Sequence, residues 1–93
     1  MELEHEKYQE TVVYQRKLLE NYLQKTAKCL KFDGTAQMDE YSESFGTAIS
    51  YVPDKIRNEM IAIDKDINDR EIEKAYSRFI LLLPELTTKI QTL

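Results

Sequence analysis

Glycine and proline are scarce in this chain of 93 residues, which contains only two of each. All-β folds need a tight turn between most pairs of strands, and such turns depend on these residues. The scarcity therefore favours helices. At 42% apolar and 32% charged residues, the chain is too apolar for a disordered tail and too charged for the inside of a bilayer. Because its length accommodates only one hydrophobic core, we expect a single helical domain over residues 1–93.

Cysteine and long apolar runs are equally rare. Cys29 is the only cysteine, so no internal disulfide can form, and its spacing predicts a buried, unreactive thiol. The charged N-terminus lacks the apolar stretch of a signal peptide. The longest apolar run, Phe79–Leu83, has five residues, whereas a membrane-spanning helix needs about 20. We therefore expect an intracellular protein, cytoplasmic or nuclear, that has no contact with a membrane.

A basic excess is also missing. The net charge is −4, and residues 1–46 carry nine acids and six bases, while residues 47–93 carry eight and seven. Proteins that bind nucleic acid concentrate positive charge against the phosphates. Nucleic acid is therefore an unlikely partner. The alternative is a regulatory protein that touches nucleic acid through a local basic face of the first helix, formed by Lys17, Lys25, Lys28 and Lys31.

Apolar residues recur every three or four positions in four segments, which is the period of an α-helix. In each segment these residues form one stripe along the helix, called here the inner stripe, that is expected to face the core. In the order of the helices, the four stripes are Tyr8, Val12, Leu19, Leu23, Ala27 and Leu30; Met38, Tyr41, Phe45, Ala48, Ile49 and Val52; Ile56, Met60, Ile63 and Ile67; and Ile72, Ala75, Tyr76, Phe79, Leu83, Leu86, Ile90 and Leu93. The pattern predicts an all-α protein, a three- or four-helix bundle. Its first helix is long (residues 3–32), and its second (35–52) and third (from 53) are short.

Residues that typically start or stop helices predict where each of the four helices begins and ends. Asp33-Gly34 is typical of a left-handed helix stop, and Pro53 suits the first position of the third helix. Asn68 followed three residues later by Glu71 matches a capping box, so the fourth helix is expected from residue 69. Pro84 predicts a kink or a short separate last helix. Gly46 indicates either a close helix approach or a break.

Residues for catalysis are few. His5 is the only histidine, and without a second fixed partner it is best interpreted as a solvated side chain. Asp64, Asp66 and Asn68 have the spacing of the first calcium-loop ligands, but the required glycine and the final glutamate are replaced by Asp69 and Ala75. Two isolated glycines make no phosphate-binding loop. We therefore predict no catalytic residue, no metal and no cofactor. The alternative is a small helical enzyme with a cleft lined by Arg16, Glu20 or Asp39.

Among the apolar residues that miss the inner stripes are Val13, Tyr14, Ile61 and Leu81, which turn away from the seam of their helix. The first helix, at about 45 Å, is also longer than its neighbours, at about 25 Å, and would be left partly uncovered. A second buried surface would explain both features. The sequence therefore predicts a non-enzymatic protein–protein interaction module, either a homodimer or a subunit of a larger assembly, with these four residues binding the partner.

Overall fold

The computed structural model describes residues 2–32 and 35–93, with side chains for residues 11–32 and 36–93. Its elements are α1 (Glu2–Phe32), α2 (Thr35–Ala48), the 3-10 helix η1 (Ile49–Tyr51), α3 (Asp54–Asn68) and α4 (Ile72–Gln91). No strand occurs in these residues. The prediction of an all-α helical bundle is therefore confirmed. The predicted Asp33-Gly34 stop lies outside the described residues.

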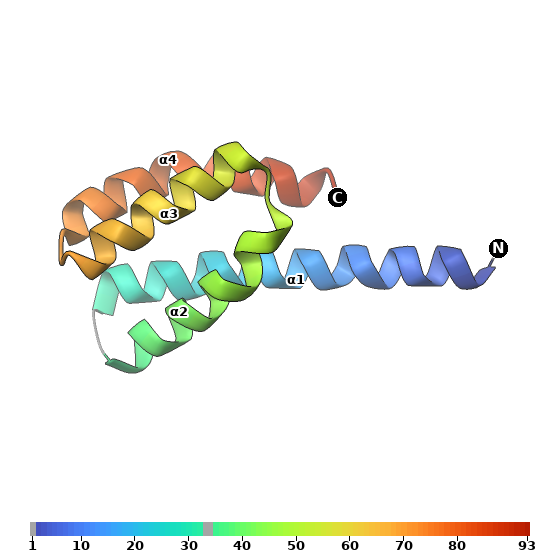
Figure 1. The fold of residues 1–93 in the computed structure, drawn as a ribbon, viewed down its shortest axis with the longest axis horizontal. Coiled ribbons are helices and arrows are strands. Elements are labelled where there is room, and N and C mark those ends of the chain that lie inside the picture. Colours follow the sequence, from blue (N-terminus) through green and yellow to red (C-terminus); the bar gives the residue numbers. More distant parts are fainter. Residues whose placement is uncertain (1, 33–34) are drawn as a thin grey trace.

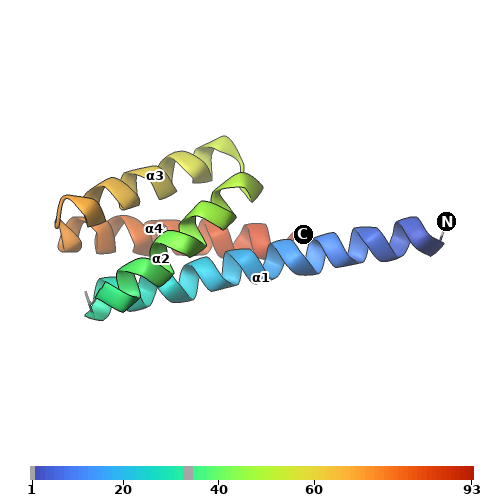
Figure 2. The same ribbon diagram turned by 60° about the horizontal axis from the view of Figure 1, so that its bottom comes forward.

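Successive helices run in opposite directions (Figure 1). α1 packs against both α2 and α4, and α3 packs against α4. α4 ends part-way along α1, and the N-terminal turns of α1 project beyond the other three helices in both views (Figures 1 and 2). The molecule consequently measures 50 × 25 × 16 Å. α1 therefore has a portion that no other helix accompanies.

One apolar core joins the four helices. Its buried side chains are Leu19, Tyr22, Cys29, Leu30, Tyr41, Ala48, Val52, Ile56, Met60, Ile63, Ile67, Ala75, Phe79, Leu82, Leu86 and Ile90. Most of these belong to the predicted stripes, and Cys29 is buried as expected. These stripe residues are buried because their helix has at least one neighbour on that side, whereas the side chain of Tyr8 lies outside the described residues.

Three stripe residues were predicted wrongly, since Ala27, Tyr76 and Leu83 are exposed. In α4 the buried leucine is Leu82 and not Leu83. The reason is that α3 packs on one side of α4, where Asp66 pairs with Arg78 (2.8 Å) and Lys55 pairs with Glu85 (3.1 Å). That contact rotates Tyr76 and Leu83 out of the core.

An equivalent rotation affects α1, where Thr26 is buried in place of Ala27. α2 packs on the side of α1 that carries Lys25 and Cys29. Lys25 pairs with Glu40 of α2 (3.1 Å), and the sulfur of Cys29 lies 3.3 Å from that of Met38. The core face of α1 is thus turned toward α2 by about one residue.

The turn between α3 and α4 differs from the predicted capping box. Asn68 ends α3 instead of capping α4, and no side chain caps α4 at Glu71. The backbone N–H groups of Arg70 and Glu71 donate to the carbonyls of Ile67 (3.1 Å) and Asp66 (2.8 Å). Arg70 takes the left-handed conformation, with φ of 62°. This is a Schellman motif, and it moves the start of α4 to Ile72.

At three glycine and proline positions the helix boundaries differ from those predicted. Pro53 is the residue before α3, not the first within it. α2 continues through Gly46, and a Cβ there would meet no atom within 4 Å, so Gly46 marks neither a break nor a close approach. α4 is one helix that contains Pro84, so a separate last helix does not form. A kink at Pro84 stays a prediction.

Candidate protein-binding surfaces

The four residues predicted to bind a partner are all solvent-exposed. Val13 and Tyr14 of α1 are 48% and 52% exposed, Ile61 of α3 is 48% exposed, and Leu81 of α4 is 72% exposed. They lie on three different helices. The exposure follows from their spacing, because each falls outside the face that its helix buries in the core.

Among the described side chains of α1, Val13 and Tyr14 come before the first buried one, Leu19. At 3.6 residues per turn, Val13 is on the side of α1 opposite the buried Tyr22. The Tyr14 ring meets Tyr51 of η1 edge to face, with centroids 6.0 Å apart. Beside Tyr14 is an open hollow of about 420 Å³, and its lining residues all belong to α1: Tyr14, Lys17, Leu18, Glu20, Asn21 and Gln24. This outer face of α1 is therefore accessible to a partner.

Ile61 and Leu81 do not belong to one patch. Ile61 lies one turn before Asp64, which accepts a hydrogen bond from Tyr41 of α2, so it flanks the α2 side of α3. Leu81 lies one turn after Arg78, which pairs with Asp66, so it flanks the α3 side of α4. The structure thus separates the predicted residues into three places: the outer face of α1, one flank of α3 and one flank of α4.

A further apolar row on α4 was missed by sequence reasoning. Tyr76, Ile80 and Leu83 are 55%, 47% and 37% exposed and follow the i, i+4, i+7 spacing of one helix face. We call these three residues the α4 row. A signal for it existed in the run Phe79–Leu83, because five consecutive apolar residues surround a helix on all sides and cannot all face one core. Phe32, at the end of α1, is also exposed, with Lys31 Nζ 5.4 Å from its ring centroid.

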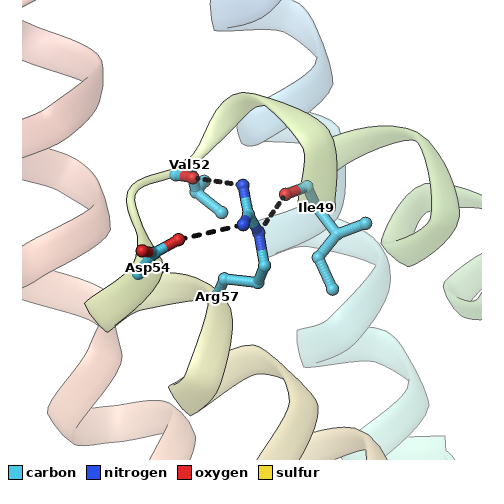
Figure 3. A network of polar contacts seen from close by, with 4 residues as sticks. All are labelled: Ile49, Val52, Asp54 and Arg57. Carbon is cyan, nitrogen blue, oxygen red and sulfur yellow. Dashed lines mark hydrogen bonds and ion pairs between the residues drawn. The ribbon is translucent and has the colours of Figure 1, made fainter.

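Arg57 holds the junction between α2 and α3 (Figure 3). Its Nε donates to the carbonyl of Ile49 (3.2 Å), and its Nη2 donates to the carbonyl of Val52 (3.1 Å). Its Nη1 lies 3.0 Å from Asp54 Oδ1. One planar guanidinium therefore serves the carbonyls of the first residue of η1 and of the residue that follows η1, together with a carboxylate at the start of α3. The arrangement fixes the backbone and leaves Arg57 little capacity for a ligand.

A polar cluster lies where α1, α2 and α3 meet. The hydroxyl of Tyr41 donates to Asp64 Oδ1 at 2.8 Å. Burial raises the pKa of Tyr41 well above its ordinary value, and Tyr22 and Asp64 nearby raise it further. Burial also raises the pKa of Tyr22, with the Thr26 hydroxyl opposing that shift. Both tyrosines are therefore neutral hydroxyls over the physiological pH range, and they act in packing rather than in proton transfer.

The calcium-like residues are used within the fold. Asp64 binds Tyr41, Asp66 pairs with Arg78, and the Asn68 amide donates to the backbone carbonyl of Asp64 (2.8 Å). All three lie on α3 instead of a loop. Across residues 2–32 and 35–93, no group of three or more His, Cys, Asp and Glu residues could hold a metal ion.

The other candidate site is a groove of about 360 Å³ between α1 and α2. Its lining includes Leu18, Asn21, Ser44 and the ion pair of Lys25 with Glu40. Of the three residues expected to line an enzyme cleft, Glu20 borders the open hollow on α1. On the proposed basic face, Lys25 is already paired with an acid, which reduces the positive charge available to a phosphate.

Comparison with known proteins identifies no relative of this chain. No family model, no curated protein and no solved structure matches this chain. Within the part of the chain that the structure describes, none of the helices has the length and hydrophobicity needed to cross a membrane. The surface of the folded chain is therefore the remaining source of information on its function.

Proposed function

We propose that this chain is a non-enzymatic protein–protein interaction module, acting by helix packing as a homodimer or as a subunit of a larger assembly. The observation that supports it most is the α4 row, three large apolar side chains in register on one helix face beside a core that is already complete. Contiguous exposed apolar residues are typical of binding surfaces on small soluble domains. Val13, Tyr14, Ile61 and Leu81 are proposed as further contacts.

Two interaction modes fit this surface. The α4 row can pack into an apolar groove of a partner, because its spacing is that of the anchors on the inserted helix in helix-in-groove recognition. The outer face of α1 offers a second, more polar surface around Val13 and Tyr14. Both surfaces are exposed in the folded chain, on helices that bury another face in the core, so binding requires no unfolding.

Photo-crosslinking in cells tests the proposal. A photoreactive amino acid is placed at Tyr14, Ile80 or Leu81, and at the exposed polar positions Ser42 and Gln91 as matched controls. We expect defined protein adducts from the apolar positions and only background from the controls, because a buried interface holds the probe against its partner. Equal background from all five positions, together with a monomeric mass at every concentration, would reject the proposal.

A further inference from the structure

α1 has opposite charges in its two halves. Residues 2–15 carry four acids and one base, whereas residues 16–32 carry five bases and one acid. Each half therefore has a net charge opposite to that of the other. Two such helices placed side by side attract each other when they run antiparallel, and they repel when they run parallel.

The geometry of α1 leaves room for such a pairing. α2 and α4 occupy the faces of α1 that carry its buried residues. Val13, Lys17, Glu20 and Gln24 are exposed and succeed one another along the side opposite Tyr22. The N-terminal turns of α1 also project past the rest of the bundle (Figures 1 and 2). A second helix can therefore lie along the outer face without meeting α2 or α4.

We infer that two copies of this chain associate through an antiparallel pairing of their α1 helices. The register follows from the charges: residue i of one copy lies opposite residue 27−i of the other. By helix spacing it places Glu10 opposite Lys17 near the middle of the shared face, and two-fold symmetry repeats this pair. The two Val13 and two Tyr14 side chains form the apolar centre. The inference rests on the proposed function and names its partner as a second copy.

The size of this interface determines how tightly the dimer is held. The overlap of residues 2–25 spans about 36 Å, and a helix is about 10 Å wide, so each copy covers roughly 360 Å² and the whole interface roughly 720 Å². That is below the ~1,200 Å² of total area found in standard stable complexes. The dimer is therefore weak and depends on concentration. Since its flanks are ion pairs, salt weakens it further.

Charge reversal tests the register. Sedimentation or light scattering between about 10 µM and 1 mM should show the wild-type mass rising from 11.0 kDa toward that of a dimer at low salt. Lys17→Glu or Glu10→Lys alone should weaken association at least about tenfold, because each places like charges together in both symmetric pairs. An equimolar mixture of the two variants should associate at close to wild-type strength. In that mixed dimer every pair is again of opposite charge.

Lys28→Glu is the matched control. It reverses an exposed lysine of the same helix, but in this register it has no residue opposite it, so association should stay within about twofold of wild type. Far-UV circular dichroism checks that all the variants remain helical. A monomer at every concentration, or variants that fail to complement each other, would overturn the inference. Adducts to a different protein from Ile80 or Leu81 would still support the proposed function, and only the loss of both results would reject both.

Discussion

At the level of single residues, the two buried tyrosines at the centre of the bundle make the stability of the fold decrease at alkaline pH. Tyr22 and Tyr41 have pKa values raised by burial above the ordinary value near 10. Both therefore stay protonated in the folded state when they would ionise in the unfolded chain. Their contribution to stability is present below pH 10 and is lost as pH rises above it, at a rate that approaches about 1.4 kcal/mol per pH unit for each tyrosine.

Tyr41→Phe should therefore reduce the fall in unfolding free energy between pH 10 and 11 by about 1 kcal/mol relative to wild type, because about half of this tyrosine is already ionised in the unfolded chain at pH 10. Urea denaturation at a series of pH values measures it. Tyr76→Phe, which removes a hydroxyl from an exposed side chain, is measured alongside as the control substitution. Equal slopes for wild type and Tyr41→Phe would contradict the burial of this hydroxyl.

Arg57 is the second residue with a defined structural effect. Its guanidinium serves the carbonyls of Ile49 and Val52 and lies 3.0 Å from Asp54 Oδ1. Arg57→Met retains the aliphatic stem but leaves both carbonyls without this donor, so we expect a loss of about 1–3 kcal/mol in unfolding free energy. Arg57→Lys should recover less than half of it, because an ammonium group cannot reproduce the planar fork. Thermal and urea unfolding measure both variants, and full rescue by lysine would show that charge alone matters.

At the level of helices, Pro84 is a local defect in an otherwise regular element. Proline has no N–H to donate to the carbonyl of Ile80, and its ring crowds that carbonyl. Pro84 is exposed, on the side of α4 away from Phe79 and Leu86, where outward-tilted carbonyls accommodate it best. Pro84→Ala should raise the unfolding free energy by about 1–3 kcal/mol. Gly46→Ala calibrates the measurement with an expected gain of about 1 kcal/mol, because its Cβ meets open space. A loss of stability on Pro84→Ala would contradict this account.

The helices also show which features a sequence can predict. The spacing of apolar residues was sufficient for four helices and for the exposure of Val13, Tyr14, Ile61 and Leu81. It could not choose between Leu82 and Leu83, since residues 81–83 are all leucine and the choice depends on the ion pairs with α3. The role of Arg57 was likewise not predictable, because its carbonyl acceptors are brought together only by the turn at η1. Partner binding by the predicted residues stays a prediction.

At the level of the whole molecule, the charge pattern of α1 and the α4 row lie on different surfaces. α1 presents its outer face opposite the core, whereas the α4 row flanks the core face of α4. One copy can therefore pair through α1 while its α4 row remains open to another protein. The two proposed modes are compatible, and a dimer would present two α4 rows to a larger assembly.

Self-association through α1 should also appear in the thermal stability of the whole protein. A folded state that dimerises is stabilised by mass action, by about 0.7 kcal/mol per protomer for each tenfold rise in concentration above the dissociation constant. For a chain of this size that corresponds to a Tm increase of about 3–5 °C per tenfold. Scanning calorimetry at low salt should show this rise for wild type and for Lys28→Glu. Lys17→Glu should show a Tm that does not depend on concentration, because its folded state remains a monomer. A Tm equally independent of concentration for wild type would mean that the folded chain does not pair with itself.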